Sequence, residues 1–146
     1  MAKVKNTGDP LHILIIRLSA IGDVIMASAI IPAIKRTYPN AKITWLIEPV
    51  AAGLLEDNPD IDQVILLPRN EWKGLRKRFR FLSYFSSMIQ FSRRLRQQHY
   101  DYVLDMQGLL KSGIWAKVSR ADHKVSLGGK EGSHIFVNDV VPRIAG

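Results

Sequence analysis

The fold of this chain is decided by residues 11–49, which read LHILIIRLSAIGDVIMASAIIPAIKRTYPNAKITWLIEP. The apolar run from Leu11 to Leu18 ends in polar residues, which is typical of a strand buried on both faces of a parallel sheet. Apolar residues then recur at helical spacing from Val24 to Ile34, and Pro39 follows just beyond this pattern. Lys42 to Pro49 is rich in strand formers. The stretch therefore predicts a strand, a helix and a second strand.

The same alternation continues along the chain. Val50 to Pro59 predicts a short helix, and Gln63 to Pro68 predicts a third strand. Tyr100 to Gly108 and His123 to Gly129 predict a fourth and a fifth strand, with a short helix between them. Strands that alternate with helices through short loops form a parallel, doubly wound α/β sheet, here with the expected strand order 3-2-1-4-5.

The composition fits one folded domain. The chain has 146 residues, and 47% of them are hydrophobic, which is enough for a packed core. The lack of cysteine excludes disulfides, thiolate metal sites and a cysteine nucleophile. The N-terminus is polar, and the apolar run that starts at Leu11 is too short to span a bilayer. We therefore expect a cytoplasmic protein.

The formal net charge of +8 indicates an anionic partner, which is a nucleic acid, an anionic membrane or a phosphorylated substrate. The alternative is that the charge serves only solubility. Much of this charge lies in residues 69–99, a basic and aromatic stretch that interrupts the alternation of strands and helices. Its basic residues are Arg69, Lys73, Arg76, Lys77, Arg78, Arg80, Arg93, Arg94 and Arg96, and its single acid is Glu71. The second half, from Phe81, has helical spacing and predicts a crossover helix, whereas the first half is either irregular or separately helical.

The turn after the first strand is the first candidate site, because a parallel sheet opens its ligand crevice at the carboxyl ends of its strands. This turn carries Ser19, Gly22 and Asp23 directly ahead of a helix. Gly22 permits a tight turn, and the free amides at a helix start favour an anion. The structural alternative is that Asp23 caps the helix. The turn lacks GxGxxG, so dinucleotide binding has no support.

Three features together resemble a known family. They are the strand that leads to Gly22-Asp23, the TWLIEP strand at residues 44–49, and the turn DMQGLLKS at residues 105–112. Over residues 11–127 the chain resembles the N-terminal domain of the ADP-heptose-dependent lipopolysaccharide heptosyltransferases, glycosyltransferase family 9. DMQGLLKS is most similar to the heptosyltransferase I branch, with heptosyltransferase II and other heptose or hexose transferases of the family as alternatives.

The resemblance implies a Rossmann-like domain, the N-terminal half of a GT-B glycosyltransferase. In this family the N-terminal half binds the acceptor, a Kdo-bearing lipid A core, and the C-terminal half binds the donor, ADP-L-glycero-D-manno-heptose. The implied reaction inverts the anomeric centre and uses neither a metal nor a cofactor. We expect residues 1–146 to be the acceptor-binding domain without its donor-binding partner, and to be inactive alone.

The resemblance also places the general base of the family at Asp23. An acceptor sugar hydroxyl must lose its proton as it attacks the donor carbon, and a carboxylate within hydrogen-bond reach takes it. The expected substrate-binding residues belong to the two turns and are Ser19, Gly22, Gln107, Gly108, Lys111 and Ser112. The alternative is that the second turn only shapes and caps its helix, with Asp105 accepting loop hydrogen bonds. Arg17 is expected to meet either an anion or a carboxylate, and Glu48 to form a loop salt bridge.

The basic stretch is expected to bind the acceptor or the anionic inner face of the cytoplasmic membrane through Arg76, Lys77, Arg78 and Arg80. The alternative is a solvated helix face with ordinary core aromatics. The four histidines are scattered, so no metal site is expected. A rival to the enzyme is a stand-alone, non-catalytic module that binds anions or lipids. Nucleic acid is not an expected partner, because no recognition motif accompanies the basic residues.

Overall fold

The computed structural model describes residues 10–107, 110–127 and 139–141. Its centre is a six-stranded sheet in the order β3-β2-β1-β4-β5-β6, in which every neighbouring pair is parallel. The strands are β1 (His12–Ile16), β2 (Lys42–Ile47), β3 (Gln63–Leu66), β4 (His99–Asp105), β5 (Arg120–Leu127) and β6 (Asp139–Val141). The predicted fold class and strand order are confirmed, and β6 is an addition that the sequence did not reveal.

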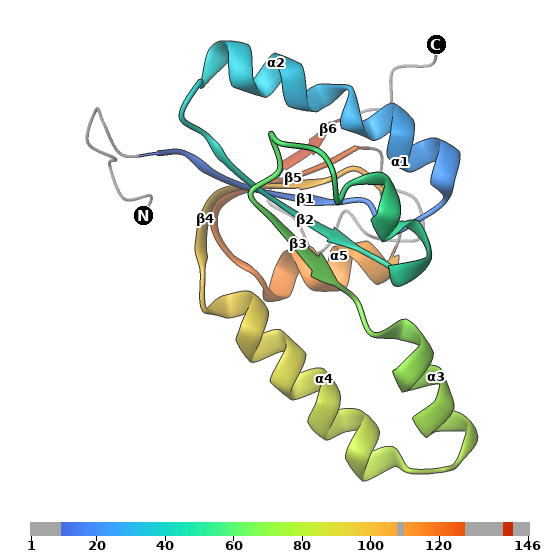
Figure 1. Ribbon diagram of the computed structural model, residues 1–146. Helices are drawn as coiled ribbons and strands as arrows, with labels where there is room; N and C mark the ends of the chain where they lie inside the picture. The colour runs from blue at the N-terminus through green and yellow to red at the C-terminus, as the bar shows by residue number, and fades with distance from the viewer. Residues whose placement is uncertain (1–9, 108–109, 128–138, 142–146) are drawn as a thin grey trace.

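Helices cover both faces of this sheet (Figure 1). They are α1 (Ile21–Ser28), α2 (Ile30–Thr37), α3 (Arg69–Lys77), α4 (Phe81–Arg96) and α5 (Leu110–Val118), together with a 3₁₀ helix, η1 (Pro49–Leu54). The short helix predicted from Val50 takes the 3₁₀ form, because Gly53 weakens an already short helix.

The prediction of one continuous helix from Val24 to Ile34 is wrong. The chain forms α1 and α2 with a break at Ala29, whose N–H donates to the carbonyl of Met26 at 3.3 Å. Pro32 accounts for the break, because it lacks the N–H that would bond to the carbonyl of Ser28 in a continuous helix. A proline in the first turn of α2 removes no hydrogen bond there.

Strand β1 separates two hydrophobic cores. Ile13 and Ile15 point to one face and pack beneath α1, α2 and η1, whereas Leu14 and Ile16 point to the other and pack beneath α3, α4 and α5. These four side chains are at most 3% exposed. Because successive side chains of a strand alternate between faces, the unbroken apolar run of β1 supplies both cores.

Helices α3 and α4 form a hairpin that projects beyond the sheet (Figure 1). Trp72 of α3 anchors it: the indole stacks on Trp115 of α5 at 5.4 Å between ring centroids and meets Phe91 of α4 edge-on at 5.6 Å. The indole N–H also donates to Oγ of Ser87 at 2.9 Å. The predicted crossover helix from Phe81 is confirmed, and the segment before it is separately helical. No helix in the described part of the chain is long and apolar enough to cross a membrane.

Candidate functional site

Two turns at the carboxyl edge of the sheet, one after β1 and one after β4, are joined by hydrogen bonds. Oε1 of Gln107 accepts the backbone N–H groups of Leu18 at 2.8 Å and Ser19 at 3.3 Å. The N–H of Met106 donates to the carbonyl of Ile16 at 3.0 Å. Since β1 and β4 are neighbours in the sheet, the two turns form one rim, as the strand order predicted.

Asp23 lies on this rim, in the first turn of α1. Its Oδ2 is 2.6 Å from a guanidinium nitrogen of Arg17, and its side chain is 56% exposed. The alternative that Asp23 caps α1 is wrong, because Ala20 occupies the capping position and no side chain caps the helix there. A carboxylate in the first turn is favoured by the helix dipole and stays open to solvent.

Arg17 links Asp23 to the second turn. Its side chain is 11% exposed, and its second terminal nitrogen donates to the carbonyl of Met106 at 3.0 Å. Of the two partners expected for Arg17, a free anion or a carboxylate, the structure shows the carboxylate. A charge-assisted hydrogen bond from a nearly buried guanidinium fixes the direction in which the Asp23 carboxylate points.

The other expected contacts are placed as follows. Ser19 is half-buried and Gly22 exposed. The expectation that Gly22 makes a tight turn is wrong, because it is the second residue of α1, and a Cβ added there would meet nothing within 4 Å. Gly108 lies outside the described residues, as do the side chains of Lys111 and Ser112, whose backbone forms the start of α5. Binding of substrate by these residues stays a prediction.

Gln107 holds the rim together, a role that sequence reasoning missed. Its side chain is buried, and its own N–H donates to Oδ1 of Asp105 at 3.2 Å. The carbonyl oxygen serves two backbone N–H groups of the other turn. The nearest signal in the sequence was the alternative that Asp105 accepts loop hydrogen bonds, and that expectation is confirmed.

We predict that Gln107→Leu lowers the free energy of unfolding by about 2 kcal/mol, because two backbone N–H groups lose their acceptor inside the protein. Urea denaturation measures the change. The same substitution at exposed Gln90 is the matched control and should shift the free energy by less than about 0.5 kcal/mol. Equal effects at the two positions would show that the hydrogen bonds of Gln107 do not hold the rim.

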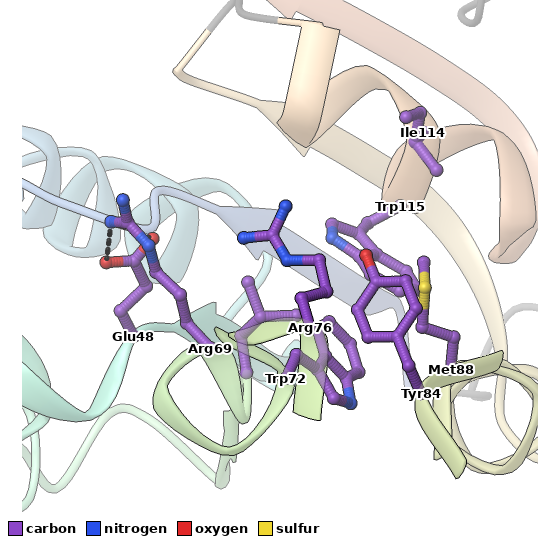
Figure 2. A pocket seen from close by; sticks show the side chains of 9 residues that line it. Glu48, Arg69, Trp72, Arg76, Tyr84, Met88, Ile114 and Trp115 are labelled. Atoms are coloured by element: carbon purple, nitrogen blue, oxygen red, sulfur yellow. Dashed lines mark hydrogen bonds and ion pairs between the residues drawn. The ribbon is translucent and has the colours of Figure 1, made fainter. Parts of the chain in front are cut away.

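A pocket of about 240 Å³ lies next to the rim, between α3, α4 and α5 (Figure 2). It is lined by Glu48, Leu67, Arg69, Trp72, Arg76, Tyr84, Met88, Ile114 and Trp115. The N–H of Glu48 donates to the carbonyl of Leu18 at 3.0 Å, which places this wall beside the first turn. The sequence did not predict the pocket, because its walls come from segments far apart in the chain.

The pocket combines apolar walls with cationic groups. One guanidinium nitrogen of Arg69 donates to both oxygens of the buried Glu48 carboxylate, at 3.2 Å to Oε1 and 3.1 Å to Oε2. The expected loop salt bridge is thus confirmed. The guanidinium of Arg76 lies over the ring of Tyr84, 5.7 Å from its centroid. Figure 2 shows the guanidinium of Arg76 beside the aromatic side chains and that of Arg69 next to Glu48. Such a pocket suits a ligand with an anionic and an apolar part.

The basic residues Lys77, Arg78 and Arg80 lie away from this pocket. They are exposed at the end of α3 and in the connection to α4. Only Arg76 of the expected basic patch lines the pocket. Among the residues that the structure describes, no three His, Asp or Glu side chains gather in a way that would hold a metal ion.

Comparisons with known proteins agree with this architecture. The sequence model of glycosyltransferase family 9 (heptosyltransferase) matches residues 88–143. The lipopolysaccharide core heptosyltransferase OpsX of Haemophilus influenzae is 30% identical over 135 residues, which cover 90% of this chain and 35% of OpsX. Lipopolysaccharide heptosyltransferase 1 of Escherichia coli K12 is 28% identical over 123 residues, which cover 81% of this chain and 35% of the relative.

Solved structures share the fold. The E. coli heptosyltransferase WaaC with ADP-2-deoxy-2-fluoro heptose superposes with a TM-score of 0.80 at 23% identity, over 93% of this chain and 43% of WaaC. E. coli ADP-heptose lipopolysaccharide heptosyltransferase II gives a TM-score of 0.67 at 22% identity, over 89% of this chain and 34% of that one. This chain spans about a third of the length of its curated relatives. The resemblance to heptosyltransferases, which are glycosyltransferases, is thus confirmed.

Proposed function

We propose that this chain forms the acceptor-binding part of a glycosyltransferase that moves heptose from ADP-L-glycero-D-manno-heptose to the Kdo-lipid A inner core of lipopolysaccharide. The observation that carries the proposal is the Asp23 carboxylate, 56% exposed at the carboxyl rim of the sheet and held there by Arg17. The sequence similarity to lipopolysaccharide heptosyltransferases supports the substrate class. The fold of WaaC, solved with an ADP-heptose analogue, supports a nucleotide-sugar donor.

In the proposed reaction Asp23 is the general base. The oxygen of an acceptor hydroxyl attacks the anomeric carbon from the side opposite to ADP, and the bond from that carbon to the ADP oxygen breaks. The hydroxyl proton passes to the carboxylate of Asp23. A single displacement of this kind inverts the anomeric centre. One protein carboxylate is enough because ADP leaves with its own negative charge, unlike the leaving group in glycoside hydrolysis.

The rim and the pocket bind different parts of the acceptor. Ser19 and Gly22 flank Asp23, and the open space at Gly22 lets a sugar approach the backbone. The acceptor is also bound by Gln107, Gly108, Lys111 and Ser112. The backbone of the last two lies at the start of α5, where amides favour anions. The pocket beside the rim takes an anionic part of the acceptor through Arg76. Lys77, Arg78 and Arg80, with Arg76, bind the inner face of the cytoplasmic membrane.

Acceptor binding tests the proposal on the chain itself. Titration with Kdo-lipid A in neutral detergent micelles should saturate and perturb the fluorescence of Trp72 and Trp115, which lie in the pocket wall. ADP-heptose without acceptor should produce no comparable change, because the donor belongs to the other domain. Saturable binding of the donor with none of the acceptor would overturn the assignment of this chain to the acceptor side.

Transfer is tested by adding the donor-binding half of a family 9 enzyme in trans. We predict that heptose transfer is restored, that EDTA changes its rate by less than about two-fold, and that the chain alone releases no ADP. Intact acceptor binding without any restored transfer would instead favour a non-catalytic binding module. Release of ADP by the isolated chain would contradict the proposal that the donor binds to the other half of the enzyme.

A further inference from the structure

The end of the α3–α4 hairpin is a projecting tip with unusual side chains. Residues 78–80 connect the two helices at the point of the hairpin farthest from the sheet (Figure 1). Phe79 in this connection is 79% exposed, and Leu82 in the first turn of α4 is 89% exposed. Phe81 is 49% exposed, and its ring lies 6.1 Å from that of Phe79. The tip therefore presents large apolar side chains to solvent.

The backbone conformation of Phe79 is also unfavourable for a bulky residue. Phe79 has a φ of 54°, in the left-handed region that a bulky residue rarely adopts. The position follows the end of α3, and the N–H of Arg80 donates to the carbonyl of Leu75 at 2.9 Å, a helix ending that favours glycine. A glycine would relieve the backbone, and the exposed ring fills no core. Neither the backbone conformation nor core packing therefore explains a phenylalanine at this position.

Cations surround these apolar side chains. Arg76 and Lys77 end α3, and Arg78 and Arg80 flank Phe79 on either side, all of them exposed. The acid of α3, Glu71, lies in its first turn, at the opposite end of the helix. At a membrane surface, arginine and lysine side chains bind lipid phosphates, while aromatic and aliphatic side chains enter the zone between headgroups and acyl chains. The tip is small and projecting, which suits a lipid surface better than the broad area of a stable protein interface.

We propose that the tip, residues 78–82, inserts Phe79 and Leu82 into an anionic lipid bilayer while the four cations bind the lipid phosphates. This inference rests on the membrane association in the proposed function and adds the segment that enters the bilayer. Arg76, two residues before the tip, also lines the pocket. The opposite wall of the pocket, at Glu48, is hydrogen-bonded to the first turn. Insertion of the tip would thus fix the orientation of the hairpin, and of the pocket that α3 and α4 line, relative to the bilayer.

Vesicle sedimentation with the full chain tests the contribution of the apolar side chains. Vesicles are made of equal parts phosphatidylglycerol and phosphatidylcholine, or of phosphatidylcholine alone. The double variant Phe79→Ser and Leu82→Ser should bind anionic vesicles about ten-fold more weakly or worse, because the apolar surface no longer transfers into lipid. The control is Met26→Ser with Val50→Ser, two side chains of similar exposure, 76% and 74%, that lie outside the hairpin. Its affinity should stay within about two-fold of the parent chain.

Depth measurement separates insertion from surface attraction. The chain has no cysteine, so Phe79→Cys and Val50→Cys each provide one site for an environment-sensitive dye. On anionic vesicles the dye at position 79 should shift to the blue and be quenched by nitroxides on the acyl chains, whereas the dye at position 50 should not.

Three outcomes would overturn the inference. Binding to anionic vesicles without quenching at position 79 would refute insertion and leave membrane association standing. No binding to anionic vesicles would refute both. Salt-sensitive binding of single-stranded RNA in a filter assay, with no vesicle binding, would assign the tip to nucleic acid instead.

Discussion

Asp23→Asn should lower heptose transfer by the complete enzyme about 10²- to 10⁴-fold, because an amide cannot take the proton of the acceptor hydroxyl. The loss should fall on kcat, measured as the rate of ADP release, while KM for the acceptor changes little. The side chain is 56% exposed, so the variant should fold with an unchanged circular dichroism spectrum.

Two controls make this result specific. Asp57→Asn removes a carboxylate from an exposed position after η1 and should leave kcat unchanged. Asp23→Glu keeps a base and should retain more activity than Asp23→Asn. A variant Asp23→Asn with near-parental turnover would remove this residue from the mechanism.

Trp72→Ala should lower the free energy of unfolding by about 3–5 kcal/mol, the usual cost of emptying a large aromatic site in a core. Trp72 is 7% exposed and contacts Phe91 of α4, Trp115 of α5 and the hydroxyl of Ser87. Its loss removes the main anchor of the hairpin and opens the wall of the pocket. Urea or thermal denaturation measures the effect.

The exposed aromatic residues of the same hairpin provide the comparison for Trp72. Phe85→Ala, at a position 57% exposed, should change the free energy of unfolding by less than about 1 kcal/mol. Trp72→Phe keeps a ring in the core and should be milder than Trp72→Ala. If Trp72→Ala proved as mild as Phe85→Ala, the hairpin would not be anchored by this side chain.

The sequence pattern was sufficient to predict strands β1 to β5 of the sheet. Residues 13–16, Ile-Leu-Ile-Ile, form an unbroken apolar run, which is typical of a strand buried on both faces. The alternation of helices and strands that follows leaves few topologies open. The break at Ala29 was missed because Pro32 fits the start of a helix as well as it disrupts the middle of one. Strand β6 was missed because three residues starting at Asp139 carry no periodic signal, and the strand is defined by its pairing with β5.

The candidate site was predictable only in part. The position of Asp23 at the rim follows from the strand order, since the carboxyl ends of parallel strands meet at one edge. The role of Gln107 was not predictable, because its partners are backbone N–H groups 88 and 89 residues away in the chain. The interleaved aromatics of the basic stretch divide into core, such as Trp72, and exposed tip, such as Phe79. Only the packing of α3 against α4 and α5 decides which aromatic side chains are buried and which are exposed.

The most direct test is a crystal structure of this chain with a soluble Kdo-bearing fragment of the lipid A core. The proposed mechanism predicts that a sugar hydroxyl lies within about 2.6–3.2 Å of a carboxylate oxygen of Asp23, between the turns that follow β1 and β4. A fragment bound with no hydroxyl in reach of Asp23, or seated at another edge of the sheet, would contradict it.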